Sequence, residues 1–550
     1  YIDVYPRYIA GAIWYFKRDA KIEYLTVDQA RSLGQTFLQK AESKDLIVVI
    51  AGVTVPGKYI GGTPITIKEL ELWFKLITKP VKILVGPAAR FGIGVEGGRV
   101  VELPSRIKEN FDLIVSGDPE EVIGELFENK SLEMVDPQRV RLNYDNVDKY
   151  AVLGAKIVTQ HPNYDKNLIV EIETFRGCPR AFTGGCSFCI EPLYGMPKFR
   201  SVKSVVLEVE TLYRLGVKRF RIGRQPDLYS YHAFGIGEYE YPKPNVDAIE
   251  RLFHGIRCVA PELKTLHIDN VNPGTIFHHP EESKRITKII VKHHTPGDVA
   301  AFGIESVDPK VISLNNLKVT AEEALEAIRI VNEIGSVRGD NGLPHLLPGL
   351  NFVFGLIGET RETYHLNYQF LKEILRRGYL VRRINIRQAM IFPNTRMWSF
   401  GDKAIKKHKE IFKLYKDKIR REIDLPMLKR VVPKGTILRD AFVEKKDNGK
   451  FYARQPGSYP ILLVTSFKIP LYRYMDFVVV SHGYRSVGVI PHPINPNRAS
   501  KKLLEQVPGI GSGKASRILR ERPLTIEKLR RIVGEDTMKY FSLNDGYPEE

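Results

Sequence analysis

Three of the four cysteines in this sequence stand close together, at Cys178, Cys186 and Cys189. Three thiolates can bind three irons of a cubane 4Fe–4S cluster and leave the fourth iron open, whereas four cysteines would close it. The short spacing from Cys186 to Cys189 also suits half of a zinc site, but zinc normally takes a fourth protein ligand, and the nearest histidine is His161. The sequence therefore favours a cluster with one open iron.

The fourth cysteine, Cys258, follows a helical pattern that begins at Val246, and we expect it to be a small buried side chain rather than a ligand. Clustered thiols do not suit the disulfide framework of a secreted protein. No apolar run reaches the ~18 residues of a membrane span, and the start of the sequence lacks a signal-peptide pattern. We predict a cytoplasmic protein that has no membrane partner.

Alternating strands and helices must position these cysteines. Six apolar runs suit the strands of a partial parallel (β/α) barrel, at residues 168–173, 219–222, 265–268, 299–304, 350–354 and 383–386. The cysteines follow the first of these runs. Because active sites of such barrels lie at the carboxyl ends of the strands, the cluster is predicted at that end.

The fold class predicted for the whole chain is a multidomain α/β protein. We expect a Rossmann-like domain at residues 1–150, the barrel at 151–400 and a basic helical linker at 401–430. A small β-barrel that is a candidate for RNA binding follows at 431–495, and a helix-hairpin-helix follows at 496–550. The alternative for the linker is a solvated connector.

Positive charge is concentrated in the C-terminal third of the chain. The net charge is +19, and residues 371–550 hold 38 Lys and Arg against 18 Asp and Glu, while residues 1–370 hold 45 against 46. A surplus confined to particular domains favours a polyanionic partner such as nucleic acid over a merely solvated face.

A glycine-rich segment near the C-terminus, residues 503–519, resembles a helix-hairpin-helix. Its glycines permit a tight turn, and the start of the second helix offers backbone N–H groups to a phosphate. Such a unit reads the nucleic-acid backbone rather than the bases. Its alternative is a hairpin for protein docking. The nucleic-acid-binding residues that we predict are Gly509, Gly511, Gly513, Lys514 and Arg517.

The segment Thr174-Phe-Arg-Gly-Cys-Pro-Arg-Ala-Phe-Thr-Gly-Gly-Cys-Ser-Phe-Cys-Ile resembles the radical S-adenosylmethionine (SAM) superfamily. Its first spacing is larger than the common one, with seven residues between Cys178 and Cys186, and Gly184 and Gly185 could bring backbone N–H groups to the cluster sulfurs. The resemblance implies a 4Fe–4S cluster whose open iron chelates SAM. Cleavage of SAM then yields a 5′-deoxyadenosyl radical.

The same resemblance implies the residues that contact SAM. They follow successive strands and include Phe188 before the last cysteine, the Gly303-Ile-Glu-Ser segment and the Gly355-Leu-Ile-Gly-Glu turn. Arg224 and Gln225 stand where the superfamily usually has an acidic residue. The full predicted set is Phe188, Gly223, Arg224, Gln225, Asp269, Glu305, Ser306, Gly355 and Glu359.

The absence of histidine and of further cysteines from parts of the sequence narrows the possible functions. Residues 1–150 resemble a cobalamin-binding-type domain but contain no histidine, so we expect no cobalamin. Methylthiotransferases have a similar architecture but need three more cysteines in the N-terminal domain, and no cysteine precedes Cys178. Cys258 is the only cysteine after Cys189, so we expect no auxiliary cluster.

Across its length the chain resembles archaeal radical SAM proteins that end in a helix-hairpin-helix, the radical SAM subunits of archaeosine synthase. The resemblance implies a lyase-type reaction on tRNA, in which a partner transferase adds lysine to a 7-deazaguanine. The radical enzyme then cleaves the lysine carbon–nitrogen bond to form archaeosine. A separate electron donor reduces the cluster. Candidates for contact with the lysine are Arg383 and Arg387, with Arg224 and Glu305, by strand-end position.

Two alternatives remain open from the sequence. One is another radical SAM enzyme of tRNA modification, such as a methylase. The other is a nucleic-acid-binding or repair protein whose cluster is structural. Conversion of SAM to 5′-deoxyadenosine by the reconstituted cluster separates the enzymes from the binding protein.

Overall fold

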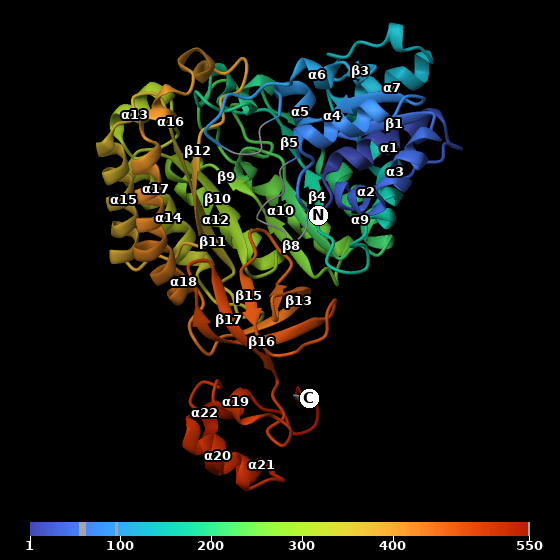
Figure 1. Ribbon diagram of the computed structural model, residues 1–550. Coiled ribbons are helices and arrows are strands. Elements are labelled where there is room, and N and C mark those ends of the chain that lie inside the picture. The colour runs from blue at the N-terminus through green and yellow to red at the C-terminus, as the bar shows by residue number, and fades with distance from the viewer. Residues whose placement is uncertain (54–61, 94–96, 548–550) are drawn as a thin grey trace.

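The computed structural model describes residues 1–53, 62–93 and 97–547 (Figure 1). The N-terminal layer lies beside a large (β/α) barrel, a small β-barrel lies below this barrel in the view, and the C-terminal helices lie beyond the small β-barrel. The α/β class and the small β-barrel predicted from the sequence are confirmed. No helix in these ranges is long and apolar enough to cross a membrane.

A three-stranded parallel sheet organises the N-terminal layer. Strand β1 (Leu46–Ile50) pairs with β2 (Val81–Val85), and β2 pairs with β3 (Leu113–Ile114). Alternate residues of β1 enter different apolar clusters, so both faces of the sheet are covered, as parallel sheets require. The surrounding helices are α2 (Val27–Leu33), α3 (Gln35–Glu42), α4 (Ile67–Leu76), α5 (Pro87–Phe91), α6 (Ser105–Lys108), α7 (Pro119–Asn129) and α8 (Asp145–Leu153).

The first residues of the chain pack against the large barrel. Ile2 forms a parallel bridge with Val170 of β4 (Val170–Glu173), and α1 (Val4–Phe16) is almost wholly buried. The Arg7 guanidinium lies 2.8 Å from the Glu208 carboxylate on α9 (Val202–Arg214), and both side chains are fully buried. The N-terminal segment is thus anchored on the barrel as well as on its own layer.

The large barrel is partial and consists of two parallel sheets, ordered β4-β7-β8 and β9-β10-β11-β12. All six predicted strands are present, and β4 and β12 are edge strands of the two sheets. Beyond the end of β12, Val100 of the N-terminal layer bridges Ile391. The other strands are β7 (Arg219–Gly223), β8 (Thr265–Ile268), β9 (Asn270–Val271), β10 (Asp298–Glu305), β11 (Leu346–Phe354) and β12 (Arg383–Gln388).

Helices connect these strands. The N-cap Thr320 forms a capping box with Glu323, which fixes the start of α14. The helices of this region are α9, α10 (Val246–Val259), α11 (Pro273–His278), α12 (Pro280–His293), α13 (Pro309–Asn315), α14 (Ala321–Gly335) and α15 (Arg361–Arg376).

The basic segment at residues 401–430 is packed against the barrel. Phe412 and Ile423 enter the main apolar core, and the Tyr368 hydroxyl on α15 donates to Glu422. The segment contains α16 (Lys403–Lys407), α17 (Lys409–Ile419), a π-helical turn (Arg420–Asp424) and α18 (Leu425–Val431). Much of its apolar surface is therefore buried, although Leu414 is exposed, and most of its lysines face outward.

The small β-barrel is closed, with strand order β13-β14-β15-β17-β16. Its inward residues, such as Leu438 and Val489, belong to the same apolar core as the large barrel. Its strands are β13 (Ile437–Asp447), β14 (Lys450–Arg454), β15 (Leu462–Thr465), β16 (Tyr474–His482) and β17 (Ser486–His492). The C-terminal helices are α19 (Lys501–Leu504), α20 (Ser512–Arg520), α21 (Ile526–Val533) and α22 (Glu535–Met538).

Candidate functional site

The three clustered cysteines lie on one loop after β4. A short antiparallel pair, β5 (Phe175–Arg176) and β6 (Lys198–Phe199), closes the base of this loop, and the Cys178 N–H donates to the Gly195 carbonyl at 3.0 Å. Cys186 is buried, while Cys178 and Cys189 are partly buried. The loop follows the carboxyl end of its strand, where barrel active sites lie.

Two glycines form turns in this loop. Gly184 and Gly185 both have positive φ, which glycine adopts at little cost. Their N–H groups donate to the carbonyls of Ala181 and Arg180, at 3.0 and 2.9 Å. These two N–H groups hold the turns of the loop, and the approach of other backbone N–H groups to the cluster sulfurs stays a prediction.

Two positive side chains, Arg180 and Lys318, lie near the thiols, as does the carboxylate of Glu191. The Arg180 guanidinium donates to the Cys186 sulfur at 3.3 Å. Burial, together with the neighbouring Cys186 thiolate, raises the pKa of Cys178 to about 11, and the same causes raise the pKa of Cys189. Binding of iron would supply the positive charge that these thiolates need. The donor set and its cationic surroundings fit a three-cysteine iron–sulfur cluster.

Glu305 and Lys318 form a second charged pair near the cysteines. Glu305 ends β10 with a positive φ, after a register shift from Gly303, and one of its carboxylate oxygens lies 3.6 Å from the Lys318 ammonium. Its other oxygen is buried and has no hydrogen-bond partner among the described residues. Although burial lowers the pKa of Lys318, the negative charges of Cys186, Glu305 and Cys189 raise it overall.

Lys318 was missed by the sequence reasoning, because no motif includes it. Its ammonium donates to the Gly303 carbonyl at 3.2 Å, which holds it between the carboxyl end of β10 and the cysteine loop. Two members of the predicted SAM set have buried polar atoms without a hydrogen-bond partner among the described residues, namely the Arg224 Nε atom and one carboxylate oxygen of Glu305. The contact of Glu305 with SAM stays a prediction.

Replacing Lys318 with methionine should make the cluster harder to reduce. Removal of a positive charge beside the thiolates disfavours the reduced, more negative cluster, so its midpoint potential should become more negative. A shift of roughly 60 mV corresponds to a tenfold change in the equilibrium constant of a one-electron couple. A redox titration followed by electron paramagnetic resonance measures the shift. The control is Lys310→Met on α13, which is exposed. Equal shifts in both variants would contradict the role of Lys318.

The residues predicted after β7 make contacts within the protein. A side chain at Gly223 would overlap the Glu171 carboxylate, so glycine leaves room for the ion pair of Glu171 with Arg221. Arg224 turns toward the N-terminal helix, where it donates to the Tyr5 hydroxyl at 2.9 Å. Gln225 is fully buried and accepts from Thr174 at 3.2 Å. Their contacts with SAM also stay predictions.

Three further predicted polar side chains have protein partners. Asp269 pairs with Arg221 and accepts from the Tyr459 hydroxyl at 3.1 Å. The Ser306 hydroxyl accepts from the Asp308 N–H at 3.2 Å. Glu359 accepts from the Gly355 N–H at 2.6 Å and contacts Tyr364 and His408. These groups shape the turns that follow their strands.

Phe188 and the predicted arginines occupy different parts of the barrel. Phe188 packs beside Cys186 on an apolar cluster that includes Leu317. Arg383 and Arg387 alternate with the buried residues Ile384 and Ile386 of β12, so they share the opposite face of that strand. Arg383 donates to Asn385 at 2.6 Å, and Arg387 is exposed.

The predicted nucleic-acid segment is open at the start of α20. A side chain added at Gly511 or Gly513 would meet no atom within 4 Å. Lys514 is instead held within the protein, because its ammonium donates to the carbonyls of Gly509 and Val533 at 3.3 and 3.2 Å. Arg517 pairs with Glu521 at 2.7 Å. The open helix start is suited to a phosphate, and its role in binding stays a prediction.

Cys258 differs from its expectation, because it is exposed on α10. Its sulfur lies 3.4 Å from His254, one helical turn earlier. The helical periodicity was right, but it placed Cys258 on the outer face of the helix.

Comparison with known proteins gives a family match. Residues 172–371 match the model of the radical SAM superfamily. The matched region runs from the end of β4, through the cysteine loop, into α15. An uncharacterized protein of Methanocaldococcus jannaschii is 48% identical over 492 residues, which cover 88% of this chain and 89% of the relative. An uncharacterized protein of Archaeoglobus fulgidus is 41% identical, with 99% and 96% covered.

Solved structures are similar at low sequence identity. The radical SAM methyltransferase TsrM from Kitasatospora setae is 16% identical, with a TM-score of 0.46 over 71% of this chain and 72% of that one. The cobalamin-dependent radical SAM enzyme OxsB is 12% identical, with a TM-score of 0.46 over 75% and 53% of the two chains.

Proposed function

We propose a specific reaction for this chain, which belongs to the radical SAM superfamily through residues 172–371 and to one family with the M. jannaschii and A. fulgidus proteins. The reaction is cleavage of the lysine carbon–nitrogen bond on a lysine-adducted 7-deazaguanine of tRNA, which forms archaeosine. The observation that carries the radical chemistry is the loop of three thiols at the carboxyl end of β4.

The residues of the chain have distinct tasks in this reaction. Cys178, Cys186 and Cys189 would hold the cluster, and the bound cluster with SAM supplies a hydrogen-abstracting radical. Arg180 and Lys318 balance the negative charge of the thiolates. Glu305 offers a buried carboxylate oxygen to a polar group of SAM. The protein otherwise positions the substrate and excludes water from the reacting atoms.

Support for a tRNA substrate comes from the C-terminal third of the chain. Its surplus of 20 positive charges is spread over the end of the large barrel (residues 371–400, +6), the basic segment (401–430, +6), the small β-barrel (431–495, +5) and the terminal helices (496–550, +3). The open start of α20 can accept a backbone phosphate. A tRNA substrate places the enzyme in the cytoplasm, with a transferase that adds the lysine and an electron donor as partners. The absence of histidine from residues 1–150 supports a reaction without cobalamin.

Incubation of the reconstituted enzyme with lysine-adducted tRNA, SAM and a reductant tests the reaction. We expect archaeosine in the digested tRNA and one 5′-deoxyadenosine per modified nucleoside, both measured by mass spectrometry. Unadducted tRNA is the control and should give no archaeosine. A cluster that cleaves SAM but leaves the adduct intact would reject this reaction, and a methylated nucleoside would identify a methylase instead.

A further inference from the structure

Four arginines gather beside the edge strand β12, near the carboxylate of Asp424. Arg383 and Arg387 come from β12, Arg420 comes from the π-helical turn, and Arg485 comes from the turn between β16 and β17. Asp424, on the π-helical turn, is the carboxylate. We call these four residues the β12 arginine cluster. Three parts of the fold, distant in sequence, therefore bring positive charge to one place.

Few contacts neutralise this charge. Asp424 pairs with Arg420, and its carboxylate lies 3.7 Å from the Arg485 Nε atom. Arg485 also donates to the Ile384 carbonyl at 2.7 Å, which fixes its turn against β12. Arg383 lies with its guanidinium 4.8 Å from the centre of the Tyr459 ring, a cation–π contact that adds no negative charge. The five charged groups keep a net charge of +3.

The arginines repel one another. Burial, and then the positive charges of Arg420 and Arg383, lowers the pKa of Arg485 to about 10. Burial also lowers the pKa of Arg383, and Arg387 and Arg420 lower it further. Like charges that are held together in this way are destabilised until an anion joins them.

We propose that the β12 arginine cluster binds phosphodiester groups of the RNA substrate beside the edge strand β12 of the partial barrel. The choice of RNA rests on the proposed function, whereas the choice of a polyanion rests on the charge of the cluster. Guanidinium groups bind phosphate through paired N–H donors, which suits a site built from several arginines.

The position of the cluster favours a backbone over a single small carboxylate. It lies beside an edge strand, and all four of its arginines belong to the basic C-terminal third. Arg387 interacts electrostatically with Glu305, so the cluster extends from the small β-barrel toward the SAM side of the large barrel. A backbone bound there could direct a nucleoside toward the cysteine loop.

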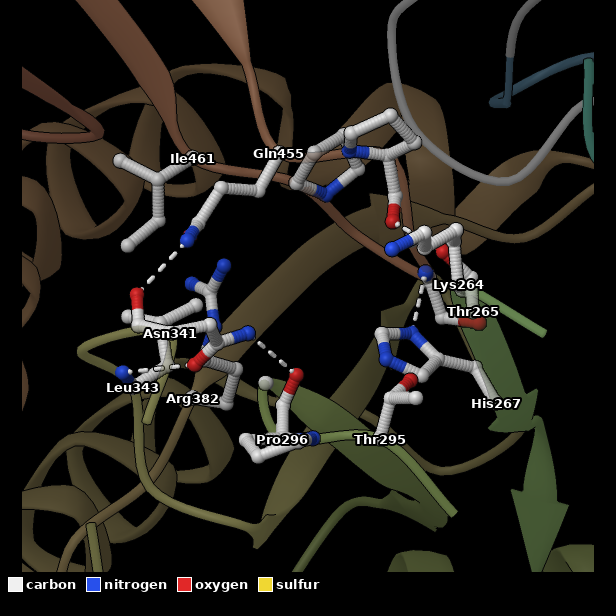
Figure 2. A pocket seen from close by; sticks show the side chains of 15 residues that line it. Lys264, Thr265, His267, Thr295, Pro296, Asn341, Leu343, Arg382, Gln455 and Ile461 are labelled. Carbon is white, nitrogen blue, oxygen red and sulfur yellow. Dashed lines mark hydrogen bonds between the residues drawn. The ribbon is translucent and has the colours of Figure 1, made fainter. Parts of the chain in front are cut away.

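One cavity of the large barrel is too small to hold the proposed substrate. It has a volume of about 40 Å³ and lies where the strands of the large barrel begin, between Asn341, Arg382 and the loop at Gln455 (Figure 2). Pockets for drug-sized ligands measure roughly 300–1,000 Å³, so this space suits only small molecules such as water. Beside this cavity, His267 of β8 accepts from the N–H of Ser458, in the loop between β14 and β15, at 2.8 Å.

Substitution of Arg485 tests the proposal. Its side chain is 39% exposed, so Arg485→Gln should fold normally. We measure the affinity of the full chain for an unmodified tRNA transcript by fluorescence anisotropy across a range of salt concentrations. Arg485→Gln should weaken binding and reduce the slope of log K against log salt by about 1. The matched control is Arg376→Gln on α15, whose side chain is 72% exposed and which should change neither.

A second variant has the opposite expected sign. Asp424→Asn removes the carboxylate that pairs with Arg420 and lies near Arg485, so it should tighten tRNA binding, with folding checked by circular dichroism. Equal effects of Arg485→Gln and Arg376→Gln would overturn the proposal. So would an Arg485→Gln variant that keeps its tRNA affinity but loses binding of L-lysine, because the cluster would then hold a carboxylate. The assay involves no turnover, so failure to form archaeosine leaves its result interpretable.

Discussion

Replacing Cys186 with alanine should abolish both cluster binding and the conversion of SAM to 5′-deoxyadenosine. Two remaining thiolates cannot hold three irons of a cubane, and Cys186 is the most buried of the three cysteines. The loop itself should persist, because the antiparallel pair at its base and the Cys178 N–H bond do not involve this sulfur. Iron and sulfide content after anaerobic reconstitution, with product analysis by mass spectrometry, measures the loss.

Cys258→Ala is the matched control for this prediction. Its thiol is exposed on α10 and lies outside the cysteine loop, so the variant should bind iron and cleave SAM like the natural protein. A Cys186→Ala protein that retains a full 4Fe–4S content would remove the basis for the proposed chemistry. A cluster that binds but never cleaves SAM would support the structural alternative.

Replacing Glu208 with glutamine should destabilise the fold more than any surface change. Glu208 is fully buried between Arg7 and Arg200, which are fully buried as well. Loss of its charge leaves two buried guanidiniums, of which Arg200 keeps the Asp148 carboxylate, whereas Arg7 keeps backbone carbonyls and the Tyr8 ring, which carry no negative charge. Breaking such a pair costs about 3–5 kcal/mol of the free energy of unfolding. Urea denaturation followed by circular dichroism measures this loss.

The stability from Glu208 should also depend on pH. Burial raises its pKa, but Arg200 and Arg7 together hold that pKa below its usual value. The carboxylate therefore contributes its full stabilisation above the unfolded value and loses it as the pH falls through the folded pKa. Glu410→Gln is the control, because its side chain is 80% exposed beside Lys413. A midpoint shift in Glu410→Gln as large as that in Glu208→Gln would refute the account.

The polar side chains after the strands illustrate what motifs do and do not specify. Glu305 and Glu359 both match superfamily positions. Glu305 has a buried carboxylate oxygen without a hydrogen-bond partner among the described residues. Glu359 is instead hydrogen-bonded by Gly355, Tyr364 and His408. The sequence cannot separate the two cases, because their partners come from other elements. The contacts show that Glu359 already has a structural task, while Glu305 has unfilled hydrogen-bonding capacity.

The sequence by itself determined the six strands of the large barrel, the closed small β-barrel and the three thiols on one loop. These features depend on local apolar periodicity and on the chemistry of neighbouring residues, both of which can be read within a short window. It also determined the concentration of positive charge in the C-terminal third.

Only the tertiary structure decided which distant residues meet. It placed Ile2 beside Val170, set Lys318 between Gly303 and the cysteine loop, and brought Arg420 and Arg485 to β12. It also turned Cys258 outward. These outcomes depend on packing between elements that are far apart in the chain, and no local pattern encodes such pairings. The three thiols define the chemistry, and the packing around them defines what can reach it.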